Sequence, residues 1–247
     1  MFAGASVIAV FGIAVNLEAY TFTFAYALNG LFLPRISRIL KDNGEILPLM
    51  IRVGRFQILL LGLVIIGFII VGKDFIYSWL GEGYEDAYVC TILFIIPSFV
   101  LLPADIADQT LIASGNVKYR AFVYVVMAIV NVLLSYFMTK SWGCIGLAFS
   151  IFIAYMIRTI ALYYVYYAKL KIDIFRFFKE SFCKMSIGLI VSALLSWWIC
   201  KQIDLTGWIN VIVKILIVIA SYCVVTMKFS INESEKQILK GLIKKYE

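Results

Sequence analysis

The chain has 247 residues, of which 63% are hydrophobic and only 15% are charged, and its mean hydropathy is +0.97. Because a soluble domain carries charge on about a quarter of its residues, this composition excludes a soluble enzyme and indicates a protein whose solvent is lipid. The net charge of +7 does not indicate a nucleic-acid partner, since the basic residues are spread between apolar segments instead of forming one patch.

Seven apolar segments follow one another along the chain, and each is long enough to cross the ~30 Å core of a bilayer as a helix. Their apolar runs are continuous, which favours helices over alternating barrel strands. The predicted fold is therefore an all-α polytopic bundle of about seven transmembrane helices. The expected spans are residues 6–33, 54–72, 88–113, 121–138, 143–166, 183–200 and 208–227.

Lysine and arginine collect in alternate connectors. Seventeen of the 22 basic residues lie in or beside connectors 34–53, 114–120 and 167–182 and in the tail from 228. Positive residues mark the cytoplasmic side, so we expect a multi-pass inner-membrane protein with its N-terminus outside and its C-terminus cytoplasmic. The tryptophans support this, because all of them fall at predicted outer ends: Trp79, Trp142, Trp197, Trp198 and Trp208. The tyrosines of segment 163–167 would mark an inner interface.

The chain lacks the usual signals of catalysis and metal binding. It has no histidine, its five cysteines form no CxxC pair, and no GxxxxGK[ST] motif occurs. We therefore expect no catalytic residue, no metal and no cofactor.

Several segments together resemble the Wzx-type polysaccharide flippases, which share a superfamily with the MATE exporters. These are the Leu-Pro-Arg-x-Ser turn at 33–37, the Gly-Lys-Asp-Phe-Ile and Trp-Leu-Gly segments within 72–84, the Lys-Tyr-Arg loop at 114–120 and the Gly-Cys-Ile-Gly start at 143–146. The resemblance implies the C-terminal half of a transporter that moves undecaprenyl-pyrophosphate-linked oligosaccharide to the outer leaflet for O-antigen or capsule synthesis. An outside N-terminus without a leader likewise suggests that upstream spans are missing.

The implied organisation has four parts. These are a five-span bundle (1–166), a basic cytoplasmic connector (167–182), two additional spans (183–227) and a basic cytoplasmic tail (228–247). The expected partners are the bilayer, the lipid-linked oligosaccharide, a coupling cation, and a missing N-terminal lobe or other polysaccharide-synthesis proteins.

Glu18 lies near the middle of the first span, and Thr21, Ala25 and Asn29 follow it at helical spacing. This polar stripe, with Glu18 and Asn29 as candidate substrate contacts, either lines an aqueous cavity or bonds a neighbouring helix. An ionisable group at this depth is costly, so it requires a partner in either case.

Asp105 and Asp108 share one face of the third span and follow Pro97 and Pro103. Proline breaks helical hydrogen bonding, and interrupted helices with polar groups often mark transporter sites. The two carboxylates are candidates for a cation site or a gate. The alternative is that they stabilise the first turn of a resumed helix and are wetted from the cytoplasm.

Arg158 lies in the fifth span, after the small residues Ser150 and Ala154 at four-residue spacing. Small residues at that spacing usually face another helix, so Arg158 should point inward, where a guanidinium suits a pyrophosphate. Alternatively it snorkels to an interface that begins at Tyr163.

Four further features have more ordinary interpretations. Lys214 should snorkel outward, and Asn131 and Asn210 should bond helices together. The aromatic and basic segment 169–182 is either an interfacial amphipathic stretch or an ordinary loop.

Two rival functions stay open for the whole protein. One is a MATE-type cation-coupled drug exporter, and the other is an integral-membrane glycosyltransferase or polymerase.

Overall fold

The structure is a computed structural model that describes residues 5–29, 32–42 and 44–230, and the side chains of these residues except 5, 6, 24–29 and 33. All of its regular elements in these residues are helical, which confirms the predicted fold class. In chain order they are α1 (Ala5–Asn29), α2 (Leu33–Lys41), α3 (Leu47–Leu80), α4 (Glu85–Leu101), the 3-10 turn η1 (Leu102–Ala104), α5 (Asp105–Ala113), α6 (Val117–Leu170), α7 (Ile174–Phe178), the π-helical turn η2 (Lys179–Cys183), α8 (Lys184–Lys201) and α9 (Gly207–Phe229).

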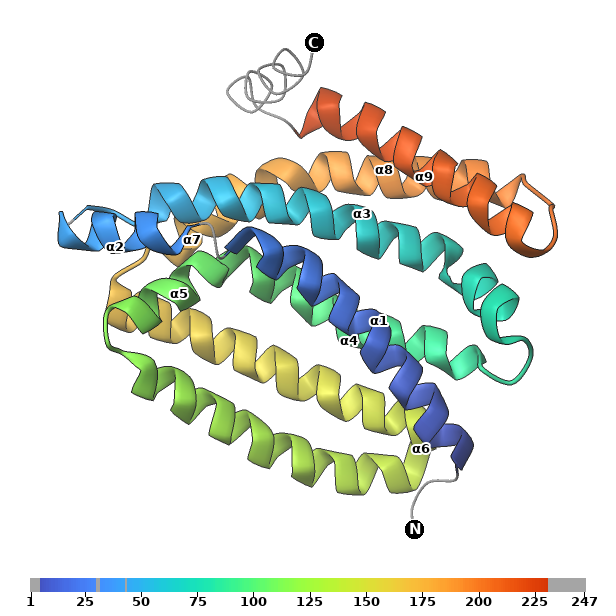
Figure 1. Cartoon of the computed structure of the whole chain (residues 1–247), viewed down its shortest axis with the longest axis horizontal. Coiled ribbons are helices and arrows are strands. Elements are labelled where there is room, and N and C mark those ends of the chain that lie inside the picture. The colour runs from blue at the N-terminus through green and yellow to red at the C-terminus, as the bar shows by residue number, and fades with distance from the viewer. Residues whose placement is uncertain (1–4, 30–31, 43, 231–247) are drawn as a thin grey trace.

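The 54-residue helix α6 is in fact a pair of antiparallel helices. Gly143 interrupts it with φ 56° and ψ −131°, and the two halves run back along each other (Figure 1). The hydroxyl oxygens of Ser135 and Ser150, one on each half, lie 2.7 Å apart. Five helical stretches of the described chain are long and apolar enough to cross a membrane, and α1 contributes the shorter apolar stretch Val7–Thr23. With α6 counted as two, the described chain makes the seven passes that the sequence predicts.

The turn of α6 depends on a close approach at Gly146. A Cβ added there would collide with the carbonyl oxygen of Met138 on the opposite half. We expect Gly146→Ala to destabilise the protein by about 1–3 kcal/mol, the usual cost of overpacking. Gly12→Ala is the matched control, because nothing lies within 4 Å of its added Cβ. Thermal unfolding of the two variants in detergent should therefore separate them, and equal midpoints would show that the turn tolerates a side chain.

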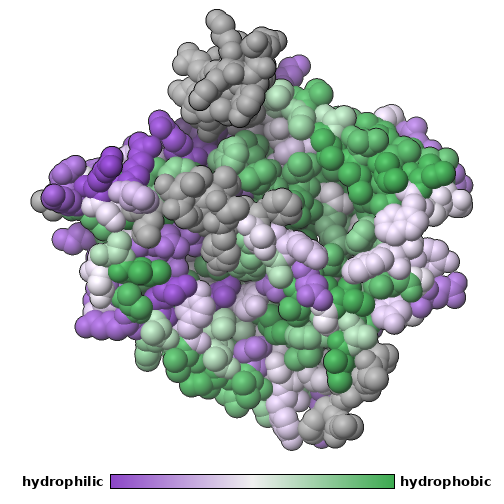
Figure 2. All heavy atoms as spheres, in the orientation of Figure 1, coloured by the Kyte–Doolittle hydropathy of each residue, from purple (hydrophilic) through white to green (hydrophobic). Residues whose placement is uncertain are grey.

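The two ends of the bundle differ in chemistry, as the alternating connectors predict. The connections that contain α2 and α7 lie together at one end (Figure 1), where Figure 2 shows hydrophilic surface beside α2. The five tryptophans, with 48–62% of each residue exposed, lie near the other end, at the end of α3, the turn of α6 and the connection of α8 to α9. Green apolar surface covers much of the face between the two ends (Figure 2).

Helix α3 is much longer than the predicted span 54–72. Pro48 lies at its start, a position that proline favours, and Gly81 ends it with φ 79°. Thirty-four residues extend about 51 Å at 1.5 Å per residue, more than the ~30 Å hydrocarbon core. The predicted connectors 34–53 and 73–87 are thus partly helical. The predicted tail 228–247 lies outside the described residues from 231 onward.

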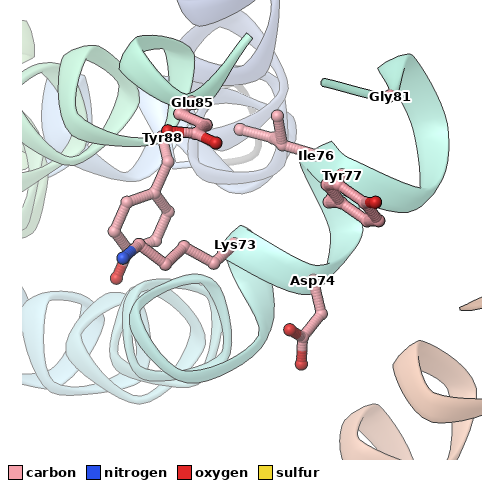
Figure 3. Close-up of a pocket in the computed structure, with 7 residues that line it drawn as sticks. All are labelled: Lys73, Asp74, Ile76, Tyr77, Gly81, Glu85 and Tyr88. Atoms are coloured by element: carbon pink, nitrogen blue, oxygen red, sulfur yellow. The ribbon is translucent and has the colours of Figure 1, made fainter. Parts of the chain in front are cut away.

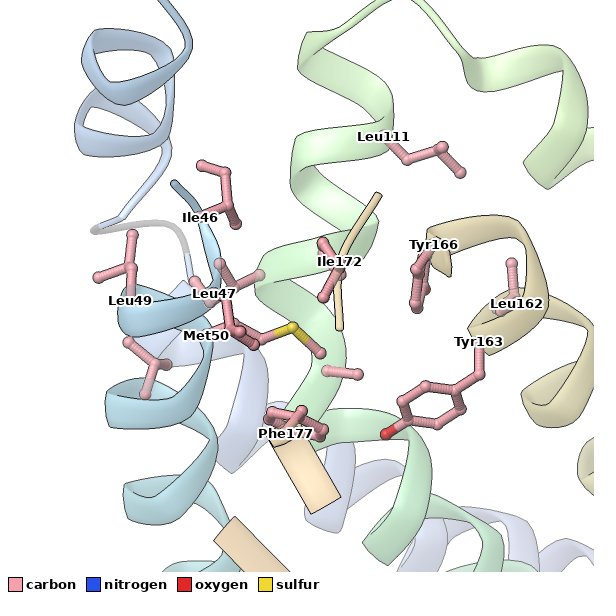
Figure 4. Packing of buried hydrophobic residues seen from close by; sticks show 14 of the residues in the cluster. Ile46, Leu47, Leu49, Met50, Leu111, Leu162, Tyr163, Tyr166, Ile172 and Phe177 are labelled. Carbon is pink, nitrogen blue, oxygen red and sulfur yellow. The ribbon is translucent and has the colours of Figure 1, made fainter. Parts of the chain in front are cut away.

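The largest buried cluster lies at the basic end and joins α3, α5, α6 and α7 (Figure 4). Tyr163 and Tyr166 belong to it, with 8% and 1% of each residue exposed, so these two do not mark an interface as predicted, whereas Tyr164 and Tyr167 are exposed. Phe177 is fully buried in the same cluster. One side of segment 169–182 thus packs into the protein, while Phe175 is 80% exposed beside the exposed residues Arg176 and Lys179. The interfacial stretch and the ordinary loop both stay predictions for this segment.

Polar contacts attach α9 to α3 at both ends. The Arg55 guanidinium donates to the carbonyl oxygens of Glu180 at 3.0 Å and Ser230 at 2.8 Å. At the other end, the Lys214 ammonium lies 2.7 Å from the Asp74 carboxylate, to which Asn210 also donates at 3.1 Å. The Lys214 ammonium thus meets a carboxylate on the neighbouring helix, an ion pair that the prediction of outward snorkelling did not include. The prediction that Asn210 bonds two helices is confirmed.

Candidate functional site

The third span breaks where the sequence predicts. The 3-10 turn η1 contains Pro103, while Pro97 remains inside α4. The break puts Asp105 and Asp108 into the first turn of α5, each with 7% of its surface exposed. They are thus first-turn carboxylates of a resumed helix, as one of the two interpretations expected, and both are buried.

Asp108 is held by two partners from α6. Nε of Arg120 lies 2.9 Å from one of its carboxylate oxygens, and the Tyr166 hydroxyl donates to the other at 3.3 Å. Asp105 accepts a bond from Gln109 at 3.3 Å. The cavity beside the two carboxylates has a volume of only about 10 Å³, roughly one water.

The described residues contain no group of three His, Cys, Asp or Glu side chains that could hold a metal ion. The cation or gate role of Asp105 and Asp108 stays a prediction, with Asp108 now engaged by Arg120.

Arg158 is buried deep in the second half of α6. Only 7% of it is exposed, and Ser150 and Ala154 on the same helix are fully buried, as the small-residue spacing predicts. The helix continues to Leu170, twelve residues or about 18 Å further. Arg158 thus points into the protein, and Tyr163, where the alternative placed an interface, is itself only 8% exposed.

Two tyrosine rings flank the Arg158 guanidinium. Its Cζ lies 4.4 Å from the ring centroid of Tyr155 and 5.5 Å from that of Tyr124. Arg120 lies over the same Tyr124 ring at 4.9 Å. Tyr124 therefore joins the Arg120–Asp108 ion pair to Arg158 through cation–π contacts, each stabilising by roughly 0.5–2 kcal/mol.

Two of the three guanidinium nitrogens of Arg158 lack hydrogen-bond acceptors despite their burial. Its Nε and Nη2 atoms are buried and have no hydrogen-bond partner among the described residues. Glu18 on α1, 8% exposed, interacts with it electrostatically but likewise has a buried Oε1 without a partner. A buried charge without hydrogen bonds is expensive, so this arrangement favours a ligand that supplies the missing acceptors.

The remaining members of the predicted polar stripe add little to the site. Thr21 is 2% exposed, and its hydroxyl bonds the carbonyl of Leu17 in its own helix at 3.4 Å. Asn29 ends α1, but its side chain lies outside the described residues. Asn131 accepts a bond from Ser135 of its own helix half at 3.2 Å, and Ser135 in turn contacts the other half.

Sequence reasoning missed four residues of the site, namely Arg120, Tyr124, Tyr155 and Tyr166. A helical-spacing signal was present for two pairs, because Arg120 and Tyr124 are four apart and Tyr155 and Arg158 are three apart. The contacts of Tyr166 and Arg120 with α5 join distant parts of the chain and carry no such signal.

Comparisons with known proteins relate this chain to a family of membrane proteins. A family model described as "Lipid II flippase MurJ" matches residues 21–225. The solved structure "Lipid II flippase MurJ, inward closed conformation" has a TM-score of 0.62 and 17% identity to the chain, and the match covers 86% of this chain and 46% of that one. At that identity the likeness shows the fold alone. The chain spans about half the length of that protein, and no curated protein matches it.

The match agrees with the flippase class that the sequence motifs implied, and with a multi-pass membrane protein. The matched family is MurJ, whereas the motifs suggested the Wzx type.

Proposed function

Because the chain belongs to the MurJ lipid II flippase family, we propose that it forms one lobe of a transporter that moves a lipid-linked precursor across the cytoplasmic membrane. Alternating access around a polar site requires two lobes. The second lobe, or another protein of precursor synthesis, is the partner that we propose for this chain.

The observation that carries the proposal is the buried, incompletely bonded guanidinium of Arg158. A phosphate oxygen is the acceptor that a guanidinium matches best, and a lipid-linked precursor carries its phosphate next to the lipid tail. We propose that Arg158 contacts this phosphate, while Glu18 accepts hydrogen bonds from the headgroup. Asn29 stays a predicted contact on the same helix.

The family name favours a lipid II-type peptidoglycan precursor as the cargo. An O-antigen or capsule oligosaccharide, which the Wzx-type motifs implied, would offer Arg158 the same phosphate chemistry. A MATE-type drug exporter needs acids and aromatics that are free to attract cations. Arg158 already lies over the rings of Tyr155 and Tyr124, which disfavours that alternative. Glycosyl transfer, the alternative from another class, has no support from the family that the chain matches.

Binding measurements test this assignment without requiring the second lobe to transport. The detergent-purified chain should bind a polyprenyl-pyrophosphate disaccharide roughly tenfold or more tightly than the uncharged polyprenyl glycan, since the phosphate contact contributes at least ~1.4 kcal/mol. Equal affinities, or preference for a lipophilic cation, would refute the proposal. Reconstitution into vesicles with a second lobe then tests transport of a fluorescent precursor.

The proposed membrane orientation gives a second expected result. Reporters fused after residues 82 and 116, which lie at opposite ends of the bundle, should report opposite compartments, with 116 cytoplasmic. This follows from the concentration of lysine and arginine at the end that contains residue 116. If both reporters lay in the same compartment, the seven-pass topology would be wrong.

A further inference from the structure

A polar pocket lies at the tryptophan end of the bundle, away from Arg158. It has a volume of about 260 Å³ between the end of α3 and the start of α4. Its lining residues are Lys73, Asp74, Ile76, Tyr77, Gly81, Glu85 and Tyr88 (Figure 3). Trp79, 48% exposed, lies on the same last turns of α3. Exposed tryptophans favour the headgroup layer, so the pocket lies at the depth of phospholipid headgroups.

The pocket has one cation and one anion that lack partners. Lys73 and Glu85 are exposed and have no hydrogen bond or ion pair within the described chain, although the Lys73 ammonium lies 6.0 Å from the Tyr88 ring centroid. Asp74 points away from them in Figure 3 and pairs with Lys214 at 2.7 Å. A ligand would therefore meet one ammonium and one carboxylate, above the buried side chain of Ile76.

The aromatic residues of the pocket further restrict which headgroup it can bind. Tyr88 already stacks on Phe68 with ring centroids 5.7 Å apart, and its hydroxyl donates to the carbonyl of Ile69 at 2.8 Å. Tyr77, the other lining ring, is exposed, but one ring beside the engaged Tyr88 does not form the aromatic cage that binds a trimethylammonium group. A primary ammonium, which donates hydrogen bonds, suits the Glu85 carboxylate better.

We propose that this pocket binds a phospholipid headgroup of the phosphoethanolamine type, with its phosphate on Lys73 and its primary ammonium on Glu85. The mixed charge disfavours a purely anionic headgroup, because Glu85 would repel it. The site is independent of the phosphate contact proposed for Arg158, and its occupant is a bulk lipid of the surrounding membrane. Bound lipid would hold the ends of α3 and α4 together.

Lipid-dependent thermal unfolding of the full detergent-purified chain tests this site. Dioleoyl-phosphatidylethanolamine, dioleoyl-phosphatidylcholine and dioleoyl-phosphatidylglycerol are titrated in mixed micelles, and the rise of the unfolding midpoint gives an apparent affinity. We expect phosphatidylethanolamine to bind roughly tenfold more tightly than either other lipid, the equivalent of one good charge-assisted hydrogen bond.

Two variants and two matched controls assign the effect to the pocket. Glu85→Gln should remove the preference for phosphatidylethanolamine over phosphatidylcholine, whereas Lys73→Gln should weaken both about equally. Asp86→Asn makes the same charge change beside Glu85 in the first turn of α4, and Lys140→Gln removes another exposed cation. Both controls should keep the tenfold preference. A wild type without the preference, or its loss in Asp86→Asn as well, would overturn the proposal.

Discussion

Replacing Arg158 with alanine should weaken binding of a pyrophosphate-linked lipid about a hundredfold, while the fold is retained. Each hydrogen bond to a charged group contributes roughly 1.5–3 kcal/mol, and two buried guanidinium nitrogens of Arg158 have no partner. Arg158→Lys should bind with intermediate affinity, because an ammonium keeps the charge but loses the planar, bidentate geometry and the stacking on Tyr155. Titration of the purified variants with the precursor measures both effects.

Two outcomes would separate a ligand contact from a structural role for Arg158. Arg38→Ala removes an exposed arginine at the basic end and should leave the affinity unchanged, which controls for loss of net charge. If Arg158→Ala bound the charged lipid as tightly as the wild type but unfolded at lower temperature, the guanidinium would only support packing around Tyr124.

Replacing Arg55 with methionine should destabilise the protein by roughly 3–6 kcal/mol. The side chain is 3% exposed and donates to the carbonyl oxygens of Glu180 and Ser230. Methionine fills most of the volume but leaves both carbonyls without this donor, and each lost bond to a charged donor costs about 1.5–3 kcal/mol. At this chain length the unfolding midpoint should fall by roughly 6–24 °C.

Arg52→Met is the matched control for this change, because Arg52 lies three residues earlier on α3 and is exposed. It should move the midpoint by less than about 1 °C, since surface substitutions usually change stability by less than ~0.5 kcal/mol. Equal shifts in the two variants would show that Arg55 does not join α9 and η2 to α3.

The sequence predicts the elements of this fold well, because hydrophobic length is a local property. The seven passes, the break at Pro103 and the inward position of Arg158 all follow from signals within about ten residues. The ends of α3 were predicted poorly. Helical hydrogen bonding continues past the apolar stretch into polar residues such as Arg52 and Asp74, which hydropathy assigns to connectors.

Pairings between distant residues could not be predicted. Arg55 meets Ser230 across 175 positions, and Lys214 meets Asp74 across 140. From the sequence alone, Lys214 was expected to reach for the membrane interface, because only its distance along the helix from the nearest water could be judged. The partners of Asp108 were missed for the same reason, since Tyr166 is 58 positions away.

The single-residue reversal at Gly143 leaves almost no loop between the two halves of α6. A protease added on that side of a sealed vesicle should find no extended peptide to cut between Val117 and Leu170, because cleavage requires several residues in an open strand. Both halves would enter the bilayer together as one hairpin during synthesis. Peptide tags placed at Gly143 should therefore disrupt insertion, whereas tags in the Lys201–Gly207 connection should be tolerated.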